Sequence, residues 1–260
     1  MKRHKIGIVG AGNVGIHLAI AFSGNAENDV FLFSRSNIEK QFSDRLKGVT
    51  LVHDLSFTKE QAEIVLLAVS DQSIEGLSNE YKDSEALLLH TSGSISLDSI
   101  MRHKKDQCGV LYPLQSFSLR RNLEYSKIPF LIEASDSKNL SRIRNLVSSI
   151  DAQCTEVDSA DRKKIHLSAV IVNNFVNHLY TLGSEYLTKN NLPFDLLFPL
   201  INETASRLAD DVPAKLQTGP ARRGDISVIQ EHLKLLENHP QLHNLYKTFS
   251  DSIANFHRQS

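Results

Sequence analysis

The sequence has little of what marks nucleic-acid-binding, membrane-spanning and disulfide-rich proteins. Its 29 Lys and Arg are balanced by 30 Asp and Glu, giving a net charge of −1, which argues against a basic surface for nucleic acid or an anionic membrane. The longest apolar runs, such as 64–69, are far too short to cross a bilayer. Its two cysteines, Cys108 and Cys154, form no metal or redox spacing. We therefore expect a reducing cytoplasm and no metal site.

Targeting and repeat signals are also missing from the chain. The basic start Met-Lys-Arg-His-Lys leads into a Gly-rich strand pattern without a small-residue cleavage site, which predicts that no signal peptide is present. Neither internal repeats nor low-complexity segments occur. A length of 260 residues suits two domains of ordinary size.

The most informative feature that is present is a Gly-x-Gly-x-x-Gly motif between an apolar strand and an apolar helix. The strand pattern covers 6–9, and Gly10, Gly12 and Gly15 follow with Asn13 and Val14 between them. Gly10 permits a tight turn, Gly12 allows backbone to approach a pyrophosphate, and Gly15 allows close helix packing. The helix N-terminus then faces the anion. The alternative, a Gly-rich turn without a ligand, is disfavoured by this strand and helix context.

The end of the second predicted strand indicates which dinucleotide is bound. The strand covers 29–33 and is followed by Ser34, Arg35 and Ser36, about 20 residues after the glycines, where an NAD enzyme commonly has Asp or Glu. A hydroxyl and a guanidinium attract a 2′-phosphate that a carboxylate would repel. The sequence therefore predicts NADP(H) as the cofactor. The alternative is that Arg35 is an ordinary solvated charge.

The order of patterns predicts an α/β N-terminal domain and an all-helical C-terminal domain. Further strands are expected at 49–52, 63–69, 84–90, 109–112 and 129–133, with a helix over 140–150. These patterns indicate a Rossmann domain with a doubly wound parallel sheet over residues 1–155. Helices are expected at 161–188, 193–208, 226–237 and 240–257. Residues 156–260 are therefore predicted to form a helical substrate-binding and dimerisation domain.

Small and hydroxylated residues follow two of the predicted strands. They are Ala68, Val69 and Ser70 after one strand, and Thr91 and Ser92 after another. Ligands of open α/β sheets bind at the carboxyl ends of strands, so we expect these residues to contact the cofactor.

His90 ends the second of these strands and would lie near the nicotinamide as a catalytic residue. The alternative is a buried histidine that only caps a loop.

The long predicted helix carries a polar stripe. His166, Asn173 and Asn177 are spaced by 7 and 4 residues, so at about 100° per residue they share one face, with Asn174 on its flank. We expect His166 to be the acid/base and Asn174 to orient the substrate. The alternative is a polar seam between helices or across a dimer interface, which we favour for Asn177.

A loop over 218–225 interrupts two predicted helices and contains Arg222 and Arg223 beside glycines. Arg223 is a candidate clamp for a substrate carboxylate or phosphate. The alternative is a solvated linker. In either case Asp225 is expected to cap the following helix.

Nearly the whole chain resembles the Rossmann-like proteins that carry a C-terminal helical domain of unknown function. These are related to coenzyme F420-dependent-type NADP oxidoreductases, pyrroline-5-carboxylate reductases and 6-phosphogluconate-dehydrogenase-like enzymes. The segments that carry the resemblance are 7–15, 67–71, 90–93, 112–115, 166–174 and 218–225. The family usually has His where this chain has Tyr112.

The resemblance implies an NADP-dependent reductase or dehydrogenase. It also implies a homodimer in which the helical domain completes a site between subunits. Related hydroxyacid dehydrogenases use a catalytic Lys on the long helix, where this chain has His166. This difference favours reduction of an imine or ketone.

The leading expectation is thus an NADP-dependent oxidoreductase that transfers a hydride between nicotinamide and a small carbonyl, imine or alcohol. A non-catalytic NADP(H)-binding sensor or scaffold is the alternative. A nucleotide-like ligand other than NADP is a third reading.

Overall fold

The computed structural model describes residues 3–258, apart from the side chains of Lys40 and Gln41. Contacts within the chain divide it into two compact units, Met1–Val172 and Asn173–Ser260. The division lies farther along the chain than the predicted boundary near residue 155, because the first turns of the long helical segment pack with the sheet.

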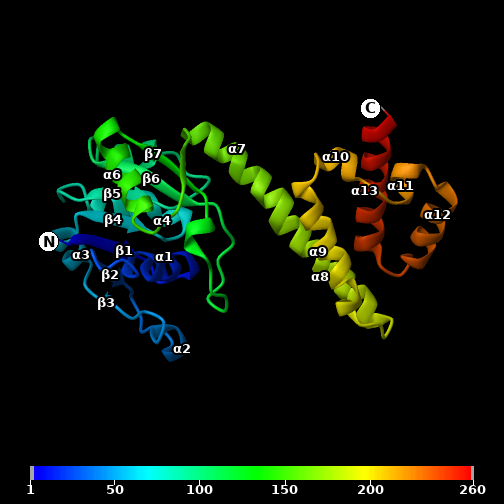
Figure 1. The fold of residues 1–260 in the computed structure, drawn as a ribbon, viewed down its shortest axis with the longest axis horizontal. Coiled ribbons are helices and arrows are strands. Elements are labelled where there is room, and N and C mark those ends of the chain that lie inside the picture. The colour runs from blue at the N-terminus through cyan, green and yellow to red at the C-terminus, as the bar shows by residue number, and fades with distance from the viewer. Residues whose placement is uncertain (1–2, 259–260) are drawn as a thin grey trace. The chain divides into compact units, whose positions relative to one another are not determined.

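The first unit is built on one sheet of eight strands in the order β3-β2-β1-β4-β5-β6-β7-β8 (Figure 1). The strands are β1 (His4–Val9), β2 (Asn28–Phe33), β3 (Val49–Val52), β4 (Ile64–Leu67), β5 (Leu87–His90), β6 (Cys108–Pro113), β7 (Phe130–Ala134) and β8 (Cys154–Glu156). The order of the first six strands is that of a dinucleotide-binding sheet. The predicted fold class is confirmed.

Helices cover both faces of this sheet because successive strand residues point to opposite faces. The helices of the first unit are α1 (Asn13–Ser23), α2 (Lys40–Ser43), α3 (Leu55–Gln61), α4 (Asp71–Glu80), α5 (Asp98–Met101), α6 (Ser137–Ser148) and α7 (Ser159–Ala169), with a 3₁₀ turn at Tyr125–Lys127; of these, α1 and α6 lie on one face of the sheet and α4 and α5 on the other. Ile6 and Ile8 belong to the core under α1 and α6, whereas Val65 and Leu67 belong to the core under α4 and α5. All four residues of β4 are buried, as its continuous apolar run indicates.

The sheet is not parallel throughout, which the sequence prediction missed. Strand β7 pairs antiparallel with β6, and β8 pairs parallel with β7. A parallel partner needs a crossover connection, usually a helix. The segment between β6 and β7 contains only the short 3₁₀ turn Tyr125–Lys127, so the chain returns directly and reverses its direction.

The second unit is helical. After the π-helical segment Val170–Phe175, its elements are α8 (Val176–Lys189), 3₁₀ turns at Phe194–Leu197 and Arg207–Ala209, α9 (Phe198–Ser206), α10 (Pro213–Leu216), α11 (Pro220–Arg223), α12 (Ile226–Leu235) and α13 (Pro240–Arg258). Within the described range, no helix is both long and apolar enough to span a membrane.

The π-helical segment changes the phase of the long predicted helix. Hydrogen bonds from i to i+5 add residues to a turn, so the constant 100° step that placed His166, Asn173 and Asn177 on one stripe does not hold through Val170–Phe175. The helix itself continues on both sides of this segment, as predicted for 161–188.

Candidate active site

One cavity of about 880 Å³ lies at the carboxyl ends of the strands of the first unit. Its volume is at the upper end of the range of about 300–1,000 Å³ that is usual for ligand sites. Most of the predicted cofactor-binding residues line it, namely Gly10, Gly12, Asn13, Val14, Ser34, Arg35, Ser36, Ala68, Val69, Ser70, Thr91 and Ser92. The cavity also reaches Tyr112 on β6 and His166 on α7. It thus follows five adjacent strands, from β2 to β6, about 19 Å at the usual strand spacing.

The glycine loop has the geometry that its motif predicts. Gly10 has φ +110°, and a Cβ there would lie 2.3 Å from the carbonyl oxygen of Ala68. A Cβ on Gly15 would lie 1.8 Å from the carbonyl oxygen of Gly10, whereas a Cβ on Gly12 would meet no atom within 4 Å. Gly15 lies behind the lining and allows the helix to approach the loop. Gly12 keeps the mouth of the cradle open.

Helix α1 presents an open N-terminus to this cradle. Its N-cap is Gly12, its first turn holds no acidic residue, and no side chain caps it. The first backbone N–H groups of a helix have no partner inside the helix. With the positive end of the helix dipole they form a site for an anion.

The end of the cavity beside β2 carries one free positive charge. Arg35 is exposed and, among the residues that the structure describes, has no hydrogen-bond or ion-pair partner. The Ser34 hydroxyl donates to the carbonyl oxygen of Ser36 at 2.6 Å, and the Ser34 carbonyl accepts from the His53 ring at 2.8 Å. These bonds hold the turn after β2, so that Arg35 projects from an ordered backbone.

A carboxylate lies on the wall formed by the loops after β4 and β5. Asp71 lies in the first turn of α4, lines the cavity and accepts a hydrogen bond from the Ser94 hydroxyl. The Ser92 hydroxyl accepts from the backbone N–H groups of Ser94 and Ile95, each at 3.1 Å. The loop after β5 is therefore held by its own side chains and by α4.

At the β6 side of the cavity, Tyr112 and His166 form a hydrogen-bonded pair. The Tyr112 hydroxyl lies 3.0 Å from Nδ1 of His166, and the rings meet edge to face with centroids 5.7 Å apart. Gly93 packs against both rings, because a Cβ on it would lie 2.6 Å from Nδ1 of His166 and 2.8 Å from Cζ of Tyr112. Burial raises the pKa of Tyr112, so its hydroxyl keeps its proton at neutral pH.

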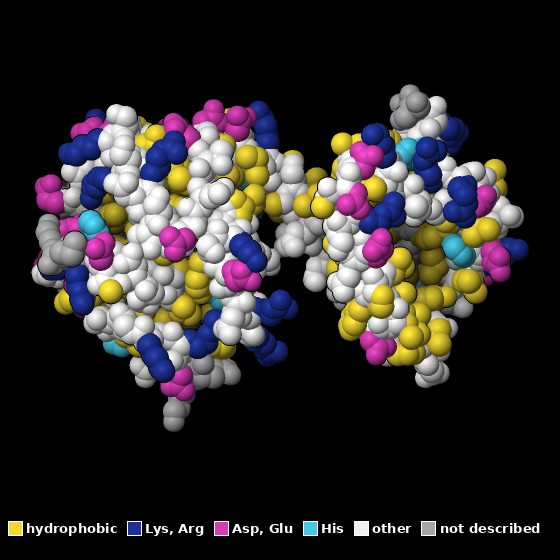
Figure 2. All heavy atoms as spheres, in the orientation of Figure 1, with side chains coloured by type: hydrophobic (Ala, Val, Ile, Leu, Met, Phe, Trp, Pro, Cys, Tyr) yellow, Lys and Arg dark blue, Asp and Glu magenta, His cyan; other side chains and the backbone are white. Residues whose placement is uncertain are grey.

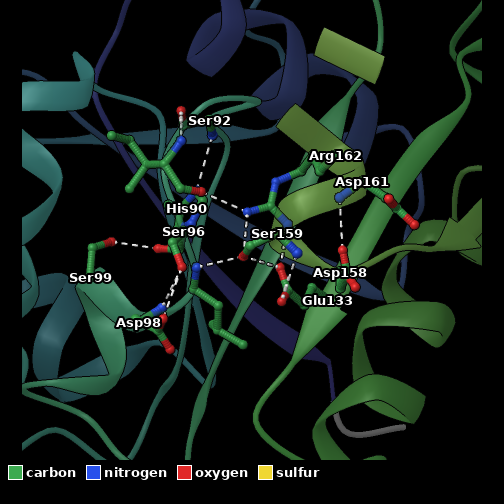
Figure 3. Close-up of polar contacts among 12 residues, drawn as sticks. His90, Ser92, Ser96, Asp98, Ser99, Glu133, Asp158, Ser159, Asp161 and Arg162 are labelled. Atoms are coloured by element: carbon green, nitrogen blue, oxygen red, sulfur yellow. Dashed lines mark hydrogen bonds and ion pairs between the residues drawn. The ribbon is translucent and has the colours of Figure 1, made fainter. Parts of the chain in front are cut away.

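Helix α7 is anchored one turn before His166 by a buried ion pair. Arg162 has no exposed surface and pairs with Glu133 on β7 (Figure 3). Its other amino group donates to the carbonyl oxygen of Ile95 at 2.6 Å and to the Ser159 hydroxyl at 3.1 Å. Since residues four apart share a helix face, this anchor orients His166 toward the cavity.

The structure does not support the predicted catalytic role of His90. Its side chain is fully buried, does not line the cavity, and accepts from the backbone N–H of Ser92 through Nδ1 at 3.2 Å. Burial, with a smaller effect of the nearby Arg162 charge, lowers its pKa to about 3. His90 is therefore neutral at physiological pH and supports the loop after β5, which is the alternative reading of a strand-end histidine.

Two predicted catalytic residues, Asn174 and Arg223, belong to the second unit and stay predictions. Arg223 pairs with Asp225, its Nε and one amino nitrogen lying 2.9 and 2.8 Å from the same carboxylate oxygen. Asp225 is the N-cap residue of α12, but its side chain makes no cap hydrogen bond. The predicted cap is wrong in this respect, because the carboxylate binds Arg223 instead.

Several residues of the site were missed from the sequence. Gly93 lies in the His-Thr-Ser-Gly segment and could have been read as a position of close approach. Arg162 precedes His166 by four residues, which is a readable signal for a shared helix face. The partnership of Tyr112 with His166 joins residues 54 positions apart and had no local signal.

The comparisons with known proteins agree with this architecture. A Rossmann-like domain profile matches residues 1–114, and the profile named Domain of unknown function (DUF2520) matches residues 128–253. The chain is similar to a Bacteroides fragilis protein, BF3122, classed provisionally as an NADP oxidoreductase. The two are 34% identical, the match covers 97% of this chain and 98% of that chain, and the TM-score is 0.88. The chain thus belongs to the family of Rossmann-like proteins with this C-terminal domain.

A solved structure of much lower sequence identity shares the fold. A Plasmodium falciparum pyrroline carboxylate reductase with NADP bound is 13% identical, with a TM-score of 0.66 and 99% of both chains covered. A curated relative, the glycerol-3-phosphate dehydrogenase [NAD(P)+] of Corynebacterium diphtheriae, is 34% identical over 114 residues. That match covers 38% of this chain and only 34% of the relative's length.

Proposed function

We propose that this protein is an NADP-dependent oxidoreductase that transfers a hydride between nicotinamide and a small carbonyl, imine or alcohol. The observation that carries the proposal is the single cavity that joins an anion cradle at α1 to the imidazole of His166. A nucleotide-binding turn alone would fit many functions. A proton-carrying side chain at the far end of the same cavity is what reduction of a carbonyl or imine requires.

The residues present fit the dinucleotide. The open position at Gly12 and the uncapped N-terminus of α1 suit a pyrophosphate. Ser34 stands at the position where an acidic residue would favour a ribose 2′-hydroxyl, and the free guanidinium of Arg35, the next residue, suits a 2′-phosphate. The bound cofactor would supply the hydride. The similarity to the Bacteroides fragilis protein, which is described as an NADP oxidoreductase, supports this assignment.

The protein's own contribution is placement and a proton. The small residues at the ends of β4 and β5 leave room for a ring against the sheet edge, and His166 presents its imidazole to the same space. Within the described chain, Nε2 of His166 has no hydrogen-bond partner, so this nitrogen is free to meet a substrate oxygen or nitrogen. Imidazole is the side chain best suited to such exchange near neutral pH.

We further propose that the protein works as a homodimer through its helical unit. Large apolar side chains there are strongly exposed, including Leu196 at 69%, Leu200 at 63% and Ile226 at 70%. Figure 2 shows apolar side chains gathered on the visible face of this unit. A second copy would cover them at little cost, since a two-fold interface uses the same patch twice. The two free cysteines suit the proposed cytoplasmic location.

Calorimetric titration with NADPH and then NADH, at one salt concentration, tests the cofactor assignment. We expect the wild type to prefer NADPH and Arg35→Ala to lose at least about tenfold in NADPH affinity, because a charge-assisted bond to phosphate is lost. Arg102→Ala is the matched control, since Arg102 is an exposed arginine paired with Glu75 outside the cavity. Equal or absent binding of both nucleotides in the wild type would overturn the proposal.

A further inference from the structure

The Tyr112–His166 pair lies at the point of the cavity where the proposed chemistry needs a proton. Both residues line the cavity, and the only hydrogen bond seen for either side chain, among described residues, is the one that joins them. Tyr112 comes from a strand and His166 from a helix that is anchored separately by Arg162. The pair is therefore a product of tertiary structure and not of local sequence.

The environment of His166 distinguishes its two ring nitrogens. Nδ1 faces the Tyr112 hydroxyl and lies against Gly93, where a Cβ would approach it to 2.6 Å. Nε2, on the opposite side of the ring, has no partner in the described chain. One nitrogen is thus enclosed by protein, and the other is available to a ligand.

The proton inventory of the pair favours one arrangement. A neutral imidazole has one donor and one acceptor nitrogen, and a phenol has a single donor hydrogen. If Nδ1 carried the ring proton, the phenol hydrogen would have no described acceptor in this half-buried position, which costs free energy. If the phenol donates to Nδ1 instead, the phenol hydrogen and the Nδ1 lone pair are both used, and the ring proton sits on Nε2, the nitrogen that protein does not enclose.

We propose that Tyr112 is a positioning residue whose hydroxyl donates a hydrogen bond to Nδ1 of His166. This hydrogen bond holds the ring as the tautomer that carries its proton on Nε2, facing the cavity. This rests on the proposed function only for its use in catalysis. For a carbonyl substrate, the Nε2 proton passes to the substrate oxygen while the Tyr112 proton passes to Nδ1. Nε2 then takes up a proton from solvent while the Nδ1 proton returns to the Tyr112 phenolate, which restores the Nε2–H tautomer and the phenol, so that the net proton delivered to the substrate comes from solvent. The transfer runs downhill because an alkoxide is far more basic than a phenolate.

The chain contains its own reference for this arrangement. His17 on α1 has Nδ1 2.9 Å from the Tyr125 hydroxyl and Nε2 3.0 Å from the carbonyl oxygen of Ser118. A carbonyl can only accept, so it requires a proton on Nε2 of His17 whatever Tyr125 does. Removing the Tyr125 hydroxyl should leave the tautomer of His17 unchanged. Removing the Tyr112 hydroxyl should let His166 adopt both neutral tautomers.

The test is ¹⁵N NMR of the imidazole rings in full-length protein labelled at histidine. The His166 signals are assigned by their loss in His166→Asn. The spectra are recorded at alkaline pH, where histidine rings are neutral and only the tautomer distinguishes the two nitrogens. We expect His166 to show a protonated Nε2 and an unprotonated Nδ1, like His17. In Tyr112→Phe the His166 signals should move toward a mixture of tautomers, while in Tyr125→Phe the His17 signals should keep their tautomer.

A second variant guards against an indirect effect of Tyr112→Phe. Gly93→Ala places a methyl group between the rings and should release the tautomer in the same way, whereas Gly76→Ala, with no atom within 4 Å of its Cβ position, should not. A proton on Nδ1 of His166 in the wild type, or an unchanged tautomer in Tyr112→Phe, would overturn the inference.

Titration of NADPH into the same samples separates this inference from the proposed function. If Tyr112→Phe binds NADPH like the wild type but keeps the tautomer of His166, the inference fails and the proposed function stands. If the wild type shows the expected tautomer but binds no NADPH, the proposed function fails and the tautomer assignment stands. With turnover in hand, Tyr112→Phe should lower kcat more than it changes KM.

Discussion

The two units of this chain differ in how many of their large apolar side chains are buried. The sheet unit buries them in two cores, one on each face, and leaves its strand ends free to build a cavity. In the helical unit, over the described residues 173–258, the buried hydrophobic residues are Leu182, Ala221 and Leu236 alone, while its other large apolar residues include many that are exposed. The difference supports the proposal that a second copy of the chain covers the exposed apolar side chains of the helical unit.

The largest expected effect is the loss of the proposed dimer through substitutions in the helical unit, far in sequence from the residues that line the cavity. Leu196→Glu combined with Ile226→Glu places charges on side chains that are 69% and 70% exposed and should convert a dimer to monomers, because buried unpaired charges are costly at an interface. Sedimentation velocity measures the change. Leu51→Glu, at a residue of the sheet unit that is 39% exposed, is the control. A wild-type monomer would contradict the proposed dimer.

The next effect breaks the anchor of the sheet unit. Glu133→Ala leaves the fully buried Arg162 without its carboxylate, which should lower the free energy of unfolding by about 3–5 kcal/mol. Urea unfolding measures it. Exposed pairs contribute little, so Glu156→Ala, which removes the exposed partner of Arg144, should change stability by less than about 1 kcal/mol. Equal effects of the two substitutions would refute the anchor.

Substitutions at two glycines of the Gly10-x-Gly12-x-x-Gly15 motif separate an effect on stability from an effect on ligand binding. A Cβ at Gly15 would overlap the backbone of Gly10, so Gly15→Ala should destabilise the protein by about 3 kcal/mol. A Cβ at Gly12 meets open space, so Gly12→Val should unfold near the wild-type urea midpoint yet lose most of its NADPH affinity. Calorimetry and urea unfolding of both variants check this. Normal NADPH binding by Gly12→Val would place the ligand elsewhere.

The smallest expected effect is a pH dependence of the free energy of unfolding that arises from His90 in the sheet unit. The pKa of His90 is lowered from 6.5 to about 3 in the folded protein, so unfolding takes up a proton between these values. The stability that neutral His90 provides is full above about pH 6.5 and is lost as the pH falls. Between pH 7.5 and 5 the wild type should therefore lose about 2 kcal/mol more than His90→Asn. Parallel losses in urea unfolding would show that His90 is protonated in the folded state.

Much of the sheet unit could be predicted because its signals are local. The Gly10-x-Gly12-x-x-Gly15 turn, the apolar run of β4 and the turn after β2 each carry their meaning in adjacent residues. The antiparallel β7 was missed because strand direction depends on how the chain returns, and the pattern of 129–133 is the same in either direction. The π-helical segment Val170–Phe175 was missed because amphipathic spacing does not reveal one added residue.

The sequence predicted the backbone features of the candidate site, such as the glycine turn, better than the side-chain pairs that join residues far apart in the sequence. His90 was misread because its position at a strand end is known from sequence, but its burial beside Arg162 is not. The pairing of Tyr112 with His166 and of Arg162 with Glu133 depends on how α7 packs against the sheet. Such pairs determine the hydrogen bonding and charge of the site, and they can be identified only from the structure.

The measurement that tests the central claim most directly is the response of the His166 ring signals to ligand. NADPH, which would fill the cavity from Arg35 to His166, should shift them and leave those of His17 in place. Adenosine 2′,5′-bisphosphate, which carries only the adenine end and the 2′-phosphate, should compete with NADPH without moving them. Unchanged His166 signals with NADPH, or equal shifts with both ligands, would contradict a cavity that runs from a phosphate clamp to a proton donor.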